Sequence, residues 1–269
     1  DAIVGQMYYN TSSGSFKAIK SGGAPIGTWS SGGTMNTARS DLSAAVFGPS
    51  SAGLGIGGYN PPGSPSARAI TESYNGSSWT EVADLNTGRW ISAGFGTQTS
   101  AVNSCGCTSD SSNFTAEAET WNGSSWTAAP DVNTTRRSYG ASGASSTSGL
   151  MFGGRNVPAY FAVTESWDGS SWTEVGDLNT ARAYMAGNGT QTSAVTASGL
   201  APSPTTVSET WNGSSWTEIT ELSTARHDAS MFGSGNTDAI ISGGAPNPKA
   251  LTEYWDGSSW TEVADRASA

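Results

Sequence analysis

Short runs of alternating apolar and polar residues, separated by glycine-containing turns, recur along the chain. The clearest is the phrase Glu-x-Trp/Tyr-Asn/Asp-Gly-Ser-Ser-Trp, whose five copies end at Trp79, Trp126, Trp172, Trp216 and Trp260. The Asn/Asp-Gly dipeptide favours a tight turn, because glycine and, to a lesser extent, Asn and Asp tolerate positive φ. Each copy therefore predicts a β-hairpin in which the aromatic residue before the turn faces the tryptophan after it, as Trp121 faces Trp126.

The hairpins recur at a regular period. The spacings between their last tryptophans are 47, 46, 44 and 44 residues, the length of a unit of about four short strands. An arginine stands ten residues after Trp29 and after each of the first four hairpin tryptophans, so the units run from arginine to arginine. They cover roughly 39–88, 89–135, 136–181, 182–225 and 226–269. We predict an all-β protein, a β-propeller of five four-stranded blades, with six blades as the alternative because a strand around Trp29 has no assigned partner.

The order of short motifs within each unit resembles the kelch repeat. Asn-Thr-Ala-Arg, Gly-Gly, Glu-x-Trp and Trp-Thr-Glu-Val follow one another over about residues 39–269, as in kelch and galactose-oxidase-type propellers. The resemblance implies the fold but no particular activity, since propellers host many functions. Units two and four share Gly-Thr-Gln-Thr-Ser-Ala-Val, at 96–102 and 189–195, and lack the double glycine. This alternation suggests a duplicated pair of blades.

Composition and charge narrow the function. A chain with 35 glycines, 11 tryptophans and only 13% charged residues favours short strands and turns over helices. The net charge of −10 disfavours binding to a phosphate backbone, so we expect no nucleic-acid partner. No apolar run reaches the roughly 18–20 residues that span a bilayer, and we expect a soluble protein without membrane insertion.

Little in the sequence favours catalysis. Cys105 and Cys107 form a Cys-Gly-Cys loop, but a structural zinc site needs four ligands and the single histidine, His227, lies in another unit. We therefore expect the two cysteines to be reduced or locally bridged, with no metal and no cofactor. The copper chemistry of galactose oxidases needs paired histidines, and no Gly-x-Ser-x-Gly motif accompanies His227. We interpret the chain as a non-enzyme.

One arginine and one glutamate recur in every unit. They are Arg39, Arg89, Arg136, Arg182 and Arg226, and Glu72, Glu119, Glu165, Glu209 and Glu253. The arginines could form a charged funnel for an anionic ligand. Alternatively, each pairs with a recurrent acid and fixes blade to blade through charge-assisted hydrogen bonds. We favour this structural role, because a feature present in every blade usually builds the blade. We likewise expect the hairpin tryptophans to pack at the outer blade edges rather than stack on sugars.

Residues that break the repeat are better candidates for binding. In a meander of four strands, the connection between blades and the loop between the second and third strands open on the same face. Variable loops on a rigid scaffold commonly carry binding residues. The candidates on this face are Tyr59, Trp90, Phe114, Arg137, Arg155, Tyr160, Phe161, His227 and Lys249. The alternative is ordinary loop variation, with the aromatic side chains packed back onto the blades.

The N-terminal segment differs from the repeats. Residues 5–17 read Gly-Gln-Met-Tyr-Tyr-Asn-Thr-Ser-Ser-Gly-Ser-Phe-Lys and predict a small hairpin of their own. The segment resembles one found before repeat regions in tail-fibre and other virion structural proteins of tailed bacteriophages, especially marine ones. The resemblance implies an N-terminal connector over about 1–28 and a propeller over 29–269, displayed on the surface of a virion.

These observations favour a non-enzymatic virion module that recognises a host-surface glycan or protein through its variable loops. One alternative is an architectural virion protein, such as a capsid decoration or tail adaptor, that binds other virion subunits. Another is a cellular lectin-like propeller. The sequence leaves open whether the chain forms a homo-oligomer.

Overall fold

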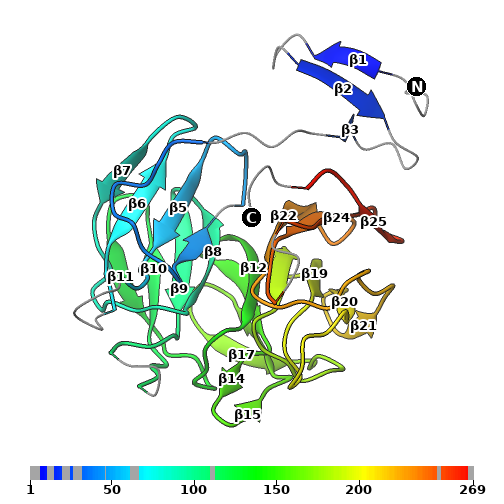
Figure 1. The fold of residues 1–269 in the computed structure, drawn as a ribbon. Coiled ribbons are helices and arrows are strands. Elements are labelled where there is room, and N and C mark those ends of the chain that lie inside the picture. The colour runs from blue at the N-terminus through cyan, green and yellow to red at the C-terminus, as the bar shows by residue number, and fades with distance from the viewer. Residues whose placement is uncertain are drawn as a thin grey trace.

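The computed structural model describes residues 7–10, 15–19, 25–26, 32–45, 47–60, 67–109, 113–246 and 250–265. All regular elements in these ranges are strands, so none of them is a helix of the length and apolarity needed to cross a membrane. Five four-stranded antiparallel sheets within the described residues are arranged around an axis as the blades of a propeller, which confirms the predicted fold (Figure 1).

Each blade follows the chain order from its inner strand to its outer strand. Blade 1 contains β4 (Ser43–Ala45), β5 (Gly53–Ile56), β6 (Thr71–Tyr74) and β7 (Trp79–Val82). Blade 2 contains β8 (Ala93–Thr97), β9 (Ser100–Ser104), β10 (Ala118–Trp121) and β11 (Trp126–Ala129). Blade 3 contains β12 (Gly140–Ser145), β13 (Ser148–Phe152), β16 (Thr164–Trp167) and β17 (Trp172–Val175), with β14 (Arg155–Asn156) and β15 (Ala159–Tyr160) paired in its loop. Blade 4 contains β18 (Ala186–Gly189), β19 (Ala194–Ala197), β20 (Ser208–Trp211) and β21 (Trp216–Glu218). Blade 5 contains β22 (Ser230–Gly235), β23 (Asp238–Ser242), β24 (Thr252–Trp255) and β25 (Trp260–Glu262).

The N-terminal segment forms a sheet of its own. Strands β1 (Met7–Asn10) and β2 (Ser15–Ile19) pair antiparallel, with Tyr9 opposite Phe16, and β3 (Pro25–Ile26) pairs with β2. The predicted hairpin is therefore confirmed. Trp29, the basis of the six-blade alternative, lies outside the described residues.

The hairpin tryptophans pack between blades rather than at exposed outer edges. Facing rings lie 5.0–5.4 Å apart in every hairpin. Trp121, Trp167, Trp211 and Trp255 are only 1–2% exposed. In the part of the chain described, four apolar clusters join each of blades 2 to 5 to the blade before it, and each contains a tryptophan from the hairpin of the later blade. Because the rings are buried at these interfaces, they stabilise the ring of blades and are not available to stack on a ligand.

The repeat arginines pair with the glutamates of the same repeat unit. In blade 2, Arg89 Nη2 lies 2.7 Å from Glu119 Oε1, and the same carboxylate accepts hydrogen bonds from the backbone N–H groups of Asn86 and Thr87. The corresponding pairs are Arg39–Glu72, Arg136–Glu165, Arg182–Glu209 and Arg226–Glu253. Each pair ties the connector from the preceding blade to the third strand of its own blade. The backbone of Arg89 bonds Arg68 and Gly58 of blade 1, while its side chain pairs with Glu119 of blade 2. The expectation that these pairs help to fix blade to blade is therefore confirmed, and the apolar clusters add to the same contact.

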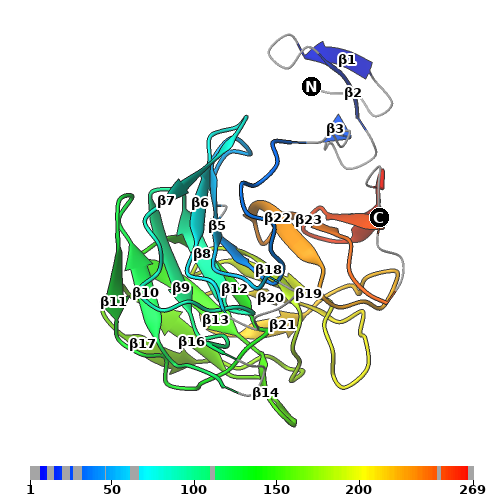
Figure 2. The ribbon, with the colours of Figure 1, turned by 60° about the vertical axis from the view of Figure 1, so that its left-hand side comes forward.

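The inner strands form an incomplete circle. β4 packs against β8, β8 against β12, β12 against β18 and β18 against β22, whereas β22 and β4 do not pack together in this way (Figures 1 and 2). A circle of backbone hydrogen bonds follows the same course: Ile91 N–H donates to Asp41 O at 3.0 Å, Ser138 to Ile91 at 3.4 Å, Tyr184 to Ser138 at 2.6 Å and Asp228 to Tyr184 at 2.9 Å. No backbone bond from Asp41 to Asp228 closes the circle among the residues described. In the part of the chain that the structure describes, the propeller is therefore open between blades 5 and 1.

Candidate functional site

The loops expected on one face do meet there. In blade 3, Arg137 and Arg155 exchange two backbone hydrogen bonds, of 3.0 Å and 2.9 Å. Equivalent bridges join Ser40 to Tyr59, Trp90 to Cys107, Ala183 to Leu200 and His227 to Ala245. The residue after each repeat arginine therefore lies beside the loop that follows the second strand of the same blade. We call the surface formed by these two sets of loops the loop face.

The double glycine Gly153-Gly154 allows the close approach of Arg137 and Arg155, as Gly154 shows. It has a φ of +101°, which side chains on L-residues disfavour. A Cβ at this position would also lie 2.9 Å from the Arg137 carbonyl oxygen. A glycine here lets the loop of blade 3 approach closely enough for Arg137 and Arg155 to pair.

Rings and arginines from different blades contact one another across the loop face. The Tyr59 ring of blade 1 lies 5.1 Å from the Trp90 ring of blade 2, measured between centroids. Phe114 of blade 2 lies against the guanidinium group of Arg137, with the Cζ atom 5.2 Å from the ring centroid. The sequence placed these four residues on one face, and the structure pairs them across the blade boundaries.

The row continues from blade 3 to blade 5. The Arg155 guanidinium lies 5.1 Å from the centroid of Tyr160 and 5.9 Å from that of Tyr184. Tyr184 in turn lies 6.1 Å from His227. We refer to Tyr59, Trp90, Phe114, Arg137, Arg155, Tyr160, Tyr184 and His227 as the aromatic–arginine row.

Tyr184 is the member that the sequence reasoning missed. It stands two positions after the repeat arginine, whereas we examined the position directly after it. Asp41, Ile91, Ser138 and Asp228 occupy the same place in the other blades, and all five have φ between +50° and +58°. Such values are uncommon outside glycine, above all for a β-branched residue such as Ile91. The available signal was that this position varies between units, with a tyrosine in unit four where the other units have aspartate, isoleucine or serine.

The other two candidates lie outside these ring contacts for different reasons. Phe161 is half-buried, and its backbone bonds Gly154 and Arg182, so it holds the loop of blade 3 in place. Lys249 lies outside the described residues.

Charge is distributed unevenly over the loop face. Within the described ranges, Arg68, Arg137 and Arg155 are the arginines that have no carboxylate within 4 Å. Arg137 is only 8% exposed, and the Nε atoms of Arg137 and Arg155 are buried without a hydrogen-bond partner. Among the described residues, blade 3 thus presents two neighbouring arginines that have no carboxylate within 4 Å.

The blade 5 end of the row is acidic. His227 Nδ1 lies 2.7 Å from Asp228 Oδ2. Burial raises the pKa of Asp228, and the neighbouring charge of Asp41 adds to this, although the hydrogen bond from His227 acts in the opposite direction. The row therefore runs from two aspartates at the open side of the ring to two unpaired arginines at blade 3.

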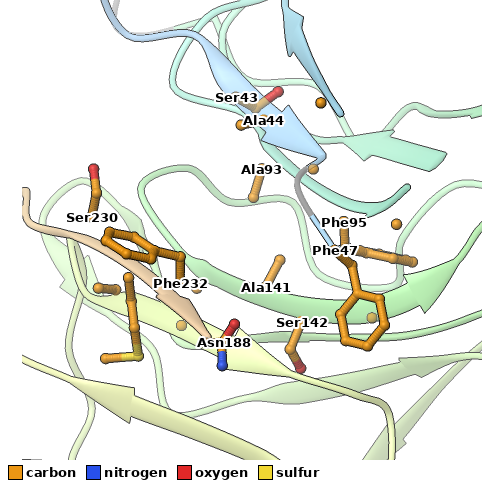
Figure 3. A pocket seen from close by; sticks show the side chains of 18 of the residues that line it. Ser43, Ala44, Phe47, Ala93, Phe95, Ala141, Ser142, Asn188, Ser230 and Phe232 are labelled. Atoms are coloured by element: carbon orange, nitrogen blue, oxygen red, sulfur yellow. The ribbon is translucent and has the colours of Figure 1, made fainter. Parts of the chain in front are cut away.

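A cavity of about 910 Å³ lies at the centre of the propeller. Small neutral side chains from the inner strands, such as Ala44, Ala93 and Ala141, line it together with Phe47 and Phe232 (Figure 3). None of its lining residues is charged. The cavity offers space but few groups that could orient a polar ligand, and it contains none of the candidate residues.

Cys105 and Cys107 are buried behind the loop face and form no disulfide bond. Burial raises the pKa of Cys105 to about 11, so the thiol is protonated at neutral pH. Since the thiolate is the reactive and metal-binding form, this thiol is poorly suited to either role. Arg137 Nη1 lies 4.0 Å from Cys107 Sγ.

Comparison with known proteins supports the fold alone. No protein-family model matches the chain. No curated protein matches it in sequence either. Among solved structures, the structure of YjhT is similar, with a TM-score of 0.68 and 12% sequence identity over 90% of this chain and 87% of that one. A likeness at this identity concerns the arrangement of blades and not the activity.

Proposed function

We propose that this chain is a non-enzymatic recognition module that binds a host-surface glycan or protein through its loop face. The observation that carries the proposal is the aromatic–arginine row, which joins all five blades on one surface. Half-buried rings such as Trp90 and Tyr160 offer flat apolar area beside polar groups, a combination that suits sugar rings and protein side chains alike. The sequence resemblance to tailed-bacteriophage proteins supports placing the module on the outside of a virion.

A glycan array with a panel of host-surface polysaccharides and intact cells provides the test. The labelled wild-type chain should bind a subset of these targets, and a variant with Trp90, Tyr160 and Phe161 changed to alanine should lose that binding. Thermal unfolding shows whether the variant is folded. A matched control, Trp79→Ala, removes a half-buried tryptophan away from the loop face and should retain binding. Equal binding by the wild type and the folded loop-face variant would contradict the proposal.

The open side of the ring favours a second candidate function, an architectural virion protein. Blade 1 presents Tyr74 and Trp79 half-buried, although the corresponding rings of blades 2 to 4 are covered by a preceding blade. Such an edge suits a β-rich virion subunit or a second copy of the chain. Analytical sedimentation of the chain alone and mixed with candidate virion subunits tests this role. An architectural protein should form a stable complex, and Trp79→Ala should weaken that complex. A monomer that binds no subunit but binds cells would leave recognition as the function.

A further inference from the structure

The proposed recognition function can be narrowed to a class of ligand. Arg137 and Arg155 lie side by side, because each accepts the other's backbone N–H group. Neither guanidinium has a carboxylate within 4 Å among the described residues, and both Nε atoms are buried without a partner. The five repeat arginines of the same chain all have glutamate partners. Buried guanidinium nitrogens without a partner also occur in Arg136, Arg182 and Arg226, so Arg137 and Arg155 differ from the repeat arginines in lacking a carboxylate partner among the described residues.

A buried guanidinium without an anion is unfavourable unless something else neutralises it. At Arg137, the rings of Phe114 and the sulfur of Cys107 provide only weak interactions. A guanidinium group presents parallel N–H donors that match the two oxygens of a carboxylate, or two oxygens of a sulfate group. An oxyanion would supply the acceptors that these guanidinium groups lack among the described residues.

We propose that Arg137 and Arg155 form an oxyanion subsite on the loop face that binds the carboxylate or sulfate group of an acidic glycan. This inference rests on the proposed recognition function and specifies its ligand. Tyr160 and Tyr184 flank Arg155 at 5.1 Å and 5.9 Å, so a sugar ring that carries the anion would find flat apolar surfaces beside the charge.

The net charge of −10 does not prevent such binding. At physiological ionic strength, charges separated by more than about 8 Å are largely screened in solvent. Glu117 Oε2, at 3.3 Å from Arg89, is engaged by a repeat arginine, and Asp41 of blade 1 and Asp228 of blade 5 lie close enough for the charge of one to act on the other. Among the described residues, no carboxylate lies within 4 Å of Arg137 or Arg155. Binding should weaken as salt is added, because the interaction is between charges.

The test uses the full chain and three probes: a glucuronate-containing oligosaccharide, its carboxyl-reduced neutral counterpart and a sulfated oligosaccharide of the same length. Titration calorimetry should show at least about tenfold weaker binding of the neutral probe than of one acidic probe, as expected for loss of charge-assisted hydrogen bonds. Which acidic probe binds distinguishes a carboxylate ligand from a sulfate ligand.

Arg155→Gln should weaken binding of the acidic probe at least about tenfold and leave the neutral probe unaffected. The affinity of Arg155→Lys for the acidic probe should lie between those of the wild type and Arg155→Gln, since lysine keeps the charge but not the paired donors. Arg68→Gln, which removes an unpaired arginine of blade 1, is the matched control and should bind like the wild type. Because Arg137 is more buried and its variant could fail to fold, Arg155 carries the test.

Three results would overturn the subsite. They are equal affinity of the neutral and acidic probes, unchanged acidic-probe binding by folded Arg155→Gln, and no binding of either acidic probe at millimolar concentration. If neutral glycans or cells still bind the wild type but not the loop-face variant, the recognition function stands and only the oxyanion subsite fails. If no glycan, cell or protein binds at all, the proposed function itself fails.

Discussion

At the residue scale, the repeat arginine and glutamate show how one motif organises each blade. Glu72 accepts hydrogen bonds from the backbone N–H groups of Asn36 and Thr37, as well as from Arg39. The Asn-Thr-Ala-Arg motif therefore forms a connector in which two backbone N–H groups and the arginine side chain donate to one buried carboxylate. The pairing of arginine with glutamate could be anticipated from their recurrence. Which arginine pairs with which glutamate could not be predicted. With equally spaced repeats, a given glutamate could pair with the arginine of the connector before its blade or with that of the connector after it.

Removing one partner of such a pair should be costly. Glu165→Gln would leave Arg136 buried without its anion, and loss of one member of a buried pair typically costs about 3–5 kcal/mol. Urea denaturation of the variant should show a loss of this size. Arg155→Gln, which breaks no ion pair, should change stability by less than about 1 kcal/mol. A loss below this value for Glu165→Gln would show that the pair is dispensable.

The Arg39–Glu72 pair makes stability depend on pH. Burial raises the pKa of Glu72, but the hydrogen bonds from Arg39, Asn36 and Thr37 outweigh this and leave the folded-state pKa below its ordinary value. Its stabilising contribution is therefore fully present above the unfolded-state pKa of about 4.3 and is lost as pH falls through the folded pKa. The urea concentration at the unfolding midpoint should decrease as the pH is lowered from neutral to about 3. The decrease should be smaller in Glu72→Gln. Identical pH profiles would refute this role.

At the element scale, the hairpins were the most predictable part of the fold. Local turn chemistry and the aromatic pair fix each hairpin within about ten residues of sequence, and the rings do face each other. The expectation of outer-edge packing was less accurate, because the sheet twist and the next blade decide which side of a hairpin is covered. A single-unit pattern contains no information on the neighbouring blade.

Equivalent tryptophans should therefore differ in their contribution to stability. Trp172 belongs to the cluster between blades 2 and 3, and truncating it to alanine should cost about 3–5 kcal/mol. Trp79 donates to the Gly33 carbonyl oxygen at 3.1 Å but has no preceding blade packed on it. We expect Trp79→Ala to cost less than half as much in the same denaturation experiment. Equal losses would indicate that the face of blade 1 is covered in solution.

At the scale of the whole molecule, the repeats predict how many blades form but not whether the ring closes. Closure depends on whether β22 reaches β4, which are separated by nearly the whole chain. The aromatic–arginine row is also a property of the whole molecule, since Phe114 meets Arg137 and Tyr184 meets His227 only across blade boundaries. The sequence placed most of its members on one face, but their partners become apparent only in three dimensions.

Amide hydrogen exchange can test the open side of the ring. The N–H groups of Ile91, Ser138, Tyr184 and Asp228 donate around the inner circle and should exchange slowly. The Asp41 N–H has no corresponding backbone partner at Asp228 and should exchange faster than these four. An Asp41 amide as protected as that of Tyr184 would mean that the ring closes in solution or that another chain covers it.

The central claim is that the loop face, rather than the central cavity or the blade edge, recognises the ligand. We would compare binding to one host-derived glycan or cell surface by three folded variants: Arg155→Gln with Tyr160→Ala on the loop face, Phe232→Ala in the cavity, and Trp79→Ala, at a residue that lies both at the edge of blade 1 and in the cavity wall. We expect that only the loop-face variant loses binding. Loss of binding in the cavity or edge variant, with the loop-face variant unaffected, would contradict it.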